Sequence, residues 1–513
     1  MRVAHAAGLA AAAREHAGRR AVTVFDIDLP PGIAFIRSLG RAAVPVIACS
    51  SRPSAAGRFS RYTSDTRRCP SVHDSDRFIT WLVDELAEGS IDLVAPTSDY
   101  VNFCVSEALT RLGASAPDVG FPKPDALRTC LFKGRFVEAL RAVGFPTLPS
   151  ADPRSLDEAR LAANEIGYPV ALKPRSHVGI GLHRGTVVRS SDELTFAYRS
   201  YEVGDGHRAA LAHVPDLASP MIQRYVEPGA ADVVSVSGCL DRSGSVLALG
   251  YSRKVSQAPK RFGVGTMFER VPPPAFTGDA VDAVRAIVGS GLFELEVLVD
   301  RSTGEHWAID LNARGFGQMS LDIAVGNDLP RLWYQSVTGT RLSPARTRRR
   351  RPDLWHDAVA SHLDFAARLL RGPERRAILR DGFGRTATTK VGAAFEWRDP
   401  LPGTIFGLMH LRHPRALLRQ FLVDIEVPRV PDRPHGGSTP HVVEHHRGVE
   451  PGRRVAGDVV AMLVGPARRR GTELGWFSRR FAVTSGRVLD TEPAVGRRRT
   501  LAYTMAAAPI QRR

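Results

Sequence analysis

Two neighbouring stretches of the chain alternate charged and apolar residues in the pattern of an antiparallel β-hairpin. They read GLFELEVLVD and EHWAIDLNAR, and a short turn separates them. Because alternate residues of a strand share one face, Glu296 of the first strand can be presented together with Asp310 and Asn312 of the second. Two carboxylates and an amide oxygen are hard ligands that suit Mg²⁺ when phosphate oxygens complete its coordination. Arg314, one alternation further along, would reach the same anionic ligand.

Each of these residues, taken singly, is also typical of the solvated face of an ordinary hairpin. The four together, beside two apolar strands, favour a site for a metal ion and an anion. Other signatures of chemistry are missing, since the sequence contains no GxxxxGK[ST] phosphate loop, no HExxH zinc helix and no GxSxG nucleophile elbow. His445 and His446 lie in a segment rich in Pro, Gly and Arg, where a solvated pair is the simpler interpretation.

The elements that must position these residues begin with a strand–helix–strand unit. A β-branched run at Val22–Val24 is followed by a turn with two prolines, an amphipathic helix and a second strand at Val44–Ala48. A third strand, Asp92–Ala95, ends in polar residues, and open parallel sheets bind ligands at that end of their strands. We therefore expect a Rossmann-like domain over residues 21–120. The absence of GxGxxG after its first strand argues against a dinucleotide.

The rest of the chain has the pattern of an α+β protein followed by less regular segments. The predicted domains are an N-terminal helix or tail at residues 1–20, the Rossmann-like domain, an α+β domain at residues 121–345, a helical or α+β extension at residues 346–428, and a basic tail at residues 429–513. Helices are predicted at Ala126–Val143, Leu156–Ile166, Val281–Val288 and Leu354–Leu370. Strands are predicted at Pro169–Lys173, Gly185–Arg189, Met221–Tyr225, Val233–Ser237, Val246–Tyr251, Phe293–Val299 and His306–Leu311, with a weaker one at Val455–Val464.

The sequence LEV, followed by DLNARG, closely resembles the metal-binding end of the ATP-grasp superfamily, where an acidic strand precedes Glu-x-Asn-x-Arg. This chain has Asp310 where that motif usually has Glu. Further motifs in the same order extend the resemblance across most of residues 20–345, and the stretch YSRKVSQAP is similar to one in the predicted carboxylate–amine ligase branch. The resemblance implies a Rossmann-like pre-ATP-grasp domain, then an ATP-grasp fold of two α+β subdomains. It also implies ATP and two Mg²⁺ ions as cofactors, with Glu296, Asp310 and Asn312 as metal ligands.

The same resemblance assigns roles to residues upstream of the hairpin. Lys133 and Lys173 resemble the family's two phosphate-facing lysines, although Lys133 alone would also fit a solvated surface. Lys173 ends an apolar strand after a Tyr-Pro turn, which favours a ligand role. The stretch SHVGIGLHRG resembles the glycine-rich flap over the phosphates, and Gly179 and Gly181 would let backbone N–H groups approach phosphate oxygens. An ordinary hairpin loop has the same composition.

Contacts to the nucleoside and the substrate are implied by the resemblance too. The stretch MIQRYVEPG is similar to the adenine-binding hinge of that superfamily. The resemblance implies that the base is contacted by Gln223, Tyr225 and Val226. A plain buried strand is the alternative. Asp232 would bind the ribose, or simply be solvated after its glycine turn. Arg253 and Lys254 would bind the carboxylate substrate or an acyl phosphate, and a charged strand edge is an equal alternative.

The activity that the resemblance implies is that of an ATP-dependent ligase. Mg-ATP would phosphorylate a small-molecule carboxylate, an amine would attack the acyl phosphate, and catalysis would fall to Arg314, Lys254 and Arg253. Two alternatives stay open: an ATP-binding regulatory protein with weak catalysis, which Asp310 supports, and a nucleic-acid-binding protein. A net charge of +17 suggests the latter, but the basic runs lack interleaved aromatic residues, so no specific nucleic acid is expected.

Composition sets the broad class of the protein. The chain has 513 residues, of which 43% are hydrophobic and 24% charged, proportions typical of globular proteins. Its five cysteines form no CxxC pair, so we expect no disulfide framework and no structural zinc, and we predict a cytoplasmic location. No apolar run is long enough to span a bilayer, and the Ala-rich N-terminus favours an exposed helix over an export signal. The positive charge gathers in the runs Arg348–Arg351, Arg468–Arg470 and Arg497–Arg499.

Overall fold

The structure is a computed structural model that describes residues 18–178, 185–203, 205–259, 261–343, 352–361 and 390–411. All of these residues fall within one compact unit of the chain. Several sequence predictions lie outside the described residues: most of the N-terminal helix or tail, Gly179 and Gly181, His445 and His446, the strand at Val455–Val464, and the whole basic tail at residues 429–513.

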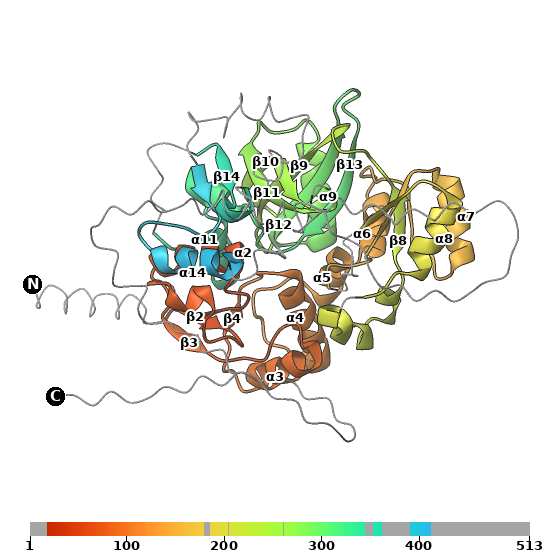
Figure 1. The fold of residues 1–513 in the computed structure, drawn as a ribbon. Coiled ribbons are helices and arrows are strands. Elements are labelled where there is room, and N and C mark those ends of the chain that lie inside the picture. Colours follow the sequence, from red (N-terminus) through yellow and green to blue (C-terminus); the bar gives the residue numbers. More distant parts are fainter. Residues whose placement is uncertain are drawn as a thin grey trace, which may run out of the picture. The chain divides into compact units, whose positions relative to one another are not determined.

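The first part of the chain forms a four-stranded parallel sheet with the order β3-β2-β1-β4 (Figure 1). Its elements are β1 (Val22–Val24), α2 (Pro30–Arg41), β2 (Val46–Cys49), η1 (Ala56–Phe59), β3 (Asp65–Arg67), α3 (Ser75–Ala87), β4 (Leu93–Val94), α4 (Asp99–Leu112) and η2 (Gly113–Ser115). The Rossmann-like sheet is confirmed, and β3 is an unpredicted edge strand. All three side chains of β3 are exposed, so no apolar pattern marked it.

A second sheet has four short antiparallel strands in the order β5-β8-β6-β7. Its elements are β5 (Ser150–Ala151), α7 (Leu156–Ile166), β6 (Val170–Lys173), β7 (Thr186–Val188), α8 (Ser191–Arg199), η3 (Asp205–Ala212), η4 (Pro215–Ala218) and β8 (Met221–Arg224). Val170 and Leu172 of β6 pack in one core cluster with α7 and α8. Because side chains alternate along a strand, Ala171 and Lys173 face the opposite way, toward a cavity.

The third sheet has the order β13-β12-β9-β10-β11-β14-β15, and only its last pair is parallel (Figure 1). Its strands are β9 (Ala231–Leu240), β10 (Val246–Ala258), β11 (Val264–Arg270), β12 (Gly291–Asp300), β13 (His306–Asn312), β14 (Leu354–His356) and β15 (Lys390–Gly392). The helices that follow or precede them are α9 (Thr277–Val288), α10 (Met319–Val325), α11 (Leu329–Thr338) and α14 (Pro400–Leu411). A parallel sheet followed by antiparallel sheets confirms the predicted α/β plus α+β class.

The single helix predicted at Ala126–Val143 is wrong, because the chain forms two helices there. They are α5 (Pro124–Leu131) and α6 (Lys133–Ala142). Phe132 between them is extended, with φ −108° and ψ 112°, and forms a β-bridge with Ser176. The backbone N–H of Lys133 donates to the carbonyl of Arg175 at 2.9 Å. This long-range pairing outweighs local helix propensity and places Lys133 at the first turn of α6.

The helix predicted at Leu354–Leu370 is also wrong at its start. Residues 354–356 form β14, which pairs with β11, and helix begins only at Ala358. Trp355 explains the difference, because its ring is 2% exposed, packs 5.7 Å from the ring of Phe268 and donates to Ser320 at 3.0 Å. The tertiary partner on β11, which the sequence did not reveal as a strand, thus decides the conformation here. Residues 362–370 of the predicted helix lie outside the described residues.

Candidate active site

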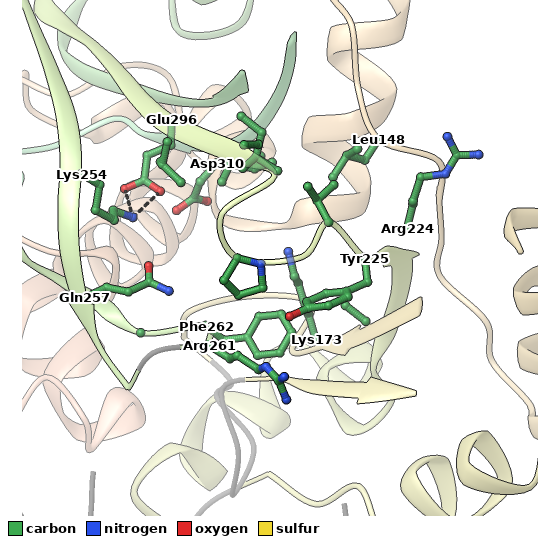
Figure 2. A pocket seen from close by; sticks show the side chains of 18 of the residues that line it. Leu148, Lys173, Arg224, Tyr225, Lys254, Gln257, Arg261, Phe262, Glu296 and Asp310 are labelled. Carbon is green, nitrogen blue, oxygen red and sulfur yellow. Dashed lines mark hydrogen bonds and ion pairs between the residues drawn. The ribbon is translucent and has the colours of Figure 1, made fainter. Parts of the chain in front are cut away.

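The hairpin with the predicted metal ligands is formed by β12 and β13. In its register Glu296 lies opposite Asp310 and Glu294 lies opposite Asn312, with a shift directly after Glu296. Glu296 and Asp310 line a cavity between the two antiparallel sheets (Figure 2). The second pair is buried and does not line it, and the Asn312 amide donates to Glu294 at 3.1 Å. The register thus brings the two carboxylates together at the cavity, whereas the predicted ligand Asn312 is bound to Glu294 and does not line the cavity.

Each carboxylate of the cavity has a cationic partner. Lys254, on β10, donates to both oxygens of Glu296 at 3.0 Å, as the dashed lines in Figure 2 show. Lys133 donates to Asp310 at 3.3 Å. Burial raises the pKa of Asp310, but the nearby positive charge, above all that of Lys133, outweighs burial and holds that pKa below its ordinary value. A divalent cation that binds here must share these carboxylates with the lysines or displace them.

Lys173 is a half-buried cation whose direct contacts are neutral. Its ammonium donates to the side-chain oxygen of Gln223 at 2.8 Å and lies 5.6 Å from the centre of the Phe262 ring. Gln223 in turn donates to Ser150 at 2.9 Å. Burial, reinforced by the ammonium of Lys133, lowers the pKa of Lys173 to about 8. A desolvated ammonium without a carboxylate among these contacts favours the binding of an anion in the cavity.

Arg314 contacts the Rossmann-like domain rather than the cavity. Its Nε and Nη2 atoms each donate to Asp99, at the first turn of α4, at 2.8 Å. Nη2 also donates to Asn312 at 2.6 Å, and Nη1 to the carbonyl of Gly315 at 2.9 Å. The pair holds the pKa of Asp99 below its usual range and raises that of Arg314, although burial opposes both shifts. Four of the five guanidinium N–H groups are engaged, so Arg314 links two domains and has little left for a substrate.

His177 is a cavity residue that the sequence analysis missed. Its Nδ1 lies 3.1 Å from Asp99, and its Nε2 lies 3.2 Å from the ammonium of Lys133 and 3.8 Å from Asp310. Assigning the ring proton to Nδ1, facing the carboxylate, lets Nε2 accept from Lys133. The polar residues after β4, which include Asp99, were the one available signal. Nothing in the sequence indicated that they would meet residue 177.

The remaining wall of the cavity is largely apolar and aromatic. The cavity encloses about 250 Å³, and this wall includes Leu148, Ala171, Tyr225, Val226, Phe262, Leu298 and Ile309. Four polar residues also line the cavity: Arg224, Glu227, Gln257 and Arg261. Tyr225 and Val226, two of the predicted base contacts, therefore belong to the apolar wall (Figure 2). The third, Gln223, is 3% exposed and lies behind Lys173. Phe262 was not identified from the sequence, and it packs so close to the backbone that a Cβ on Gly185 would lie 2.7 Å from its ring.

Asp232 and Arg253 are not brought to the cavity. Ala231 and Val233 line it, so the intervening Asp232 points to the other face of β9. There it accepts from Arg253 at 3.3 Å and from Arg301 at 2.7 Å, and the hydrogen bond from Arg301 holds its pKa below the ordinary value against burial. Arg253 also donates to Glu269 at 2.8 Å. The predicted ribose contact and the predicted catalytic role of these residues therefore lack a geometric basis.

The carboxylate next to the pair at the cavity, that of Glu294, is hydrogen-bonded by neutral donors. Glu294 accepts from Ser235 at 2.8 Å and also from Gln318 and Asn312. Burial, followed by the charge of Glu296, raises its pKa to about 7. The amide of Asn312 is thus used on both sides, by Glu294 and by Arg314.

A metal ion fits this donor set only with help from other ligands. In the described part of the chain no three His, Cys, Asp or Glu side chains form a preformed metal cluster. Glu296 and Asp310 supply two hard carboxylates at the cavity wall, and Mg²⁺ commonly takes one or two carboxylates while phosphate and water complete its shell. The residues therefore fit Mg²⁺ that arrives together with a polyphosphate.

Comparison with known proteins gives distant but consistent relatives. The model of the family "Carbamoyl-phosphate synthase L chain, ATP binding domain" matches residues 133–203. The chain is 24% identical over 298 residues to the mitochondrial methylcrotonoyl-CoA carboxylase subunit alpha of Oryza sativa subsp. japonica, covering 54% of this chain and 37% of that protein. It is 25% identical over 259 residues to the chloroplastic biotin carboxylase 1 of Populus trichocarpa, covering 48% and 42%. The matches span less than half of these relatives' own length.

A solved structure with a similar fold is the biotin carboxylase domain of the Hydrogenobacter thermophilus 2-oxoglutarate carboxylase, in complex with MgADP, ADP and bicarbonate. The TM-score is 0.51 and the identity 17%, over 64% of this chain and 71% of that one. At this identity the likeness concerns the fold, and it agrees with the sheet orders described above. The chain therefore has the fold of the ATP-grasp superfamily, with a Rossmann-like parallel sheet in front of two antiparallel sheets that enclose the candidate active site.

Proposed function

We propose that this protein is an ATP-dependent ligase that joins a carboxylate to an amine through an acyl phosphate. The observation that carries this proposal is the cavity between the two antiparallel sheets. It combines an apolar wall, the half-buried cation Lys173 and the opposed carboxylates Glu296 and Asp310. These features fit the base, the phosphates and the metal of one Mg-ATP molecule. The structurally similar biotin carboxylase domain, solved in complex with MgADP, supports the same ligand.

Each part of the nucleotide has a matching part of the cavity. Tyr225 and Val226 belong to the wall that suits a planar base. Lys173 and Lys133 supply the positive charge that phosphate oxygens need, and Lys133 would exchange Asp310 for phosphate when the nucleotide binds. Mg²⁺, when bound with ATP by Glu296 and Asp310, neutralises charge on the phosphates.

The reaction that we propose needs positioning and charge more than covalent chemistry from the protein. A substrate carboxylate oxygen attacks the terminal phosphorus, the bond to ADP breaks, and an acyl phosphate forms. The amine nitrogen then attacks the acyl carbon, phosphate leaves, and the amine proton passes to a base or to water. Lys254, 3.0 Å from Glu296, lies where an ammonium can stabilise the negative charge of the carboxylate or of the acyl phosphate.

A screen of ADP release tests the proposal. Purified protein is incubated with Mg-ATP and pairs drawn from panels of carboxylates and amines, and ADP is measured for each pair. We expect release that requires both a carboxylate and an amine, and a mass increase of the product consistent with loss of water. The rate of ADP release by the variant Lys173→Ala serves as the background. The proposal is wrong if no pair exceeds the rate of that variant.

A second candidate function is that of an ATP-binding regulatory protein with weak catalysis. The observation that favours it is that both cavity carboxylates are already paired, Glu296 with Lys254 and Asp310 with Lys133. The same screen separates the two candidates. Tight Mg-ATP binding without carboxylate-dependent ADP release would support the regulatory function.

We also propose a cytoplasmic location and small-molecule partners. All five cysteines are free thiols in the structure, and four of them are buried. Burial raises the pKa of the Cys49 thiol to about 12, which keeps it unreactive. Free thiols are typical of a reducing compartment. Within the described residues, no helix is long and apolar enough to cross a membrane.

A further inference from the structure

Helix α14 and the loop before it expose an apolar stripe to solvent. Leu401 and Leu408 lie two turns apart on α14 and are 54% and 57% exposed. In the loop before the helix, Trp397 is 86% exposed and Phe395 is 44% exposed. The opposite side of the helix is anchored, because Phe406 packs in a buried cluster with residues of α2 and η1. The helix is therefore fixed to the Rossmann-like domain by one face and presents apolar side chains with the other. We call Phe395, Trp397, Leu401 and Leu408 the α14 stripe.

Such a stripe is unusual on a surface that contacts only water. Trp397 and Phe395 pack edge to face with their ring centres 5.0 Å apart, so the two aromatic rings form one projecting group. Scattered apolar residues are normal on a surface, but contiguous apolar groups around an exposed Trp mark places of contact. The ring of Trp is also the side chain best suited to the boundary between water and lipid.

The border of the α14 stripe is positively charged. Arg61 donates to the carbonyl of Arg398 at 3.4 Å, and both residues are exposed. The nearby acidic groups are already neutralised, since Glu396 pairs with Arg41 and Asp399 is bound by Arg37 in the interior.

We propose that the α14 stripe and its arginine border dock this protein on the surface of an anionic lipid bilayer. The apolar side chains would enter the headgroup region while Arg61 and Arg398 contact lipid phosphates. A second copy of the chain is the poorer occupant, because a symmetric contact would bring the same arginines against each other. Shallow docking agrees with the absence of a membrane-crossing helix among the described residues. This inference is independent of the ligase proposal.

Vesicle binding by the full chain tests the inference. We expect the protein to sediment with vesicles of phosphatidylglycerol and phosphatidylcholine and to bind much less to phosphatidylcholine alone. The double variant Leu401→Gln/Leu408→Gln should have a vesicle–water partition coefficient that is lower roughly ten-fold or more. The reason is that each of the two substitutions removes an apolar side chain that would be inserted. The matched control Leu161→Gln/Phe196→Gln changes two residues of α7 and α8 that are 65% and 46% exposed. It should bind like the wild type.

A second readout separates the α14 stripe from the arginine runs elsewhere in the chain. Brominated lipids should quench the emission of Trp397, and this quenching should vanish in Trp397→Phe, which keeps an apolar ring and still binds. Because quenching requires insertion, electrostatic attraction by other segments cannot produce it. Equal binding by the Gln double variant would overturn the inference, and so would unchanged quenching in Trp397→Phe. Loss of a concentration-dependent dimer in the Gln double variant, without vesicle binding by the wild type, would show instead a protein interface.

Discussion

The charge of Lys173 is the residue-scale feature that most directly predicts ligand binding. Its direct contacts, Gln223 and the Phe262 ring, are neutral, so no carboxylate is hydrogen-bonded to the ammonium in these contacts. We expect Lys173→Ala to remove a charge-assisted phosphate contact worth about 1.5–3 kcal/mol. Mg-ATP affinity, measured by isothermal titration, should fall roughly ten-fold or more. The exposed Lys123→Ala is the control, and it should bind like the wild type.

The pH dependence of the same binding checks the assignment. Because the pKa of Lys173 lies at about 8 and the protonated form binds phosphate, affinity should be constant below that pH and weaken as pH rises above it. Lys173→Arg keeps its charge at high pH, so its affinity should not show this fall. A wild-type profile that stays flat well above pH 8 would contradict the role that we give to Lys173.

The metal assignment is tested at Glu296. Glu296→Gln removes one of the two carboxylates and leaves the ammonium of Lys254 buried without its partner. We expect phosphoryl transfer to be lost and Mn²⁺ binding in the presence of ADP, followed by electron paramagnetic resonance, to weaken strongly. Full turnover in this variant would show that the metal binds elsewhere. Asp310→Glu introduces the residue usual in the motif that this hairpin resembles, and we expect it to be neutral or harmful because Lys133 and His177 already contact the shorter side chain.

At the scale of secondary-structure elements, the first turn of α4 binds two residues that lie outside the Rossmann-like domain. Asp99 binds Arg314 and His177, and Ser98 caps the helix by accepting from the N–H of Val101 at 3.2 Å. Asp99→Asn leaves the largely buried guanidinium of Arg314, whose side chain is 16% exposed, without its carboxylate partner. We therefore expect the free energy of unfolding in urea to fall by about 3 kcal/mol. Turnover should fall as well, while Mg-ATP affinity changes little, because Lys173 does not contact Asp99.

The control for this variant is an ion pair of the same chemistry at the surface. Asp118 pairs with Arg242, and their side chains are 51% and 53% exposed. Solvent screens such a pair, so Asp118→Asn should cost about 1 kcal/mol or less. If the two variants unfold alike, the pair between α4 and the end of β13 does not hold the domains together as we infer.

At the scale of the whole molecule, the basic runs of the sequence are tested by truncation of the chain. Arg468–Arg470 and Arg497–Arg499 lie outside the described residues, as does all of the chain after residue 411. We expect truncation after Val427 to leave Mg-ATP binding and turnover within a few-fold of the full chain. Retention on heparin should fall, because two of the arginine runs are removed and counterion release is reduced. A truncated protein that is folded but inactive would place part of the active site in the removed segment.

The sequence by itself determined the features that depend on local periodicity. Strict alternation in β12 and β13 placed Glu296 opposite Asp310, and an apolar strand ending in Lys173 placed that cation at the cavity. The strand and turn pattern of the first 120 residues likewise predicted the parallel sheet. These features follow from residues only a few positions apart, for which strand geometry leaves little choice.

Only the tertiary structure decided which distant residues would meet. Asp99 lies 215 positions from Arg314 and 78 from His177, so no local pattern could show that one carboxylate binds both. The same cause separates α5 from α6, where a bridge to Ser176 extends Phe132, and turns residues 354–356 into a strand beside β11. In each case the contact with a long-range partner stabilises the observed conformation by more than the local propensity disfavours it. That contact exists only in the folded chain, so the sequence pattern does not reveal it.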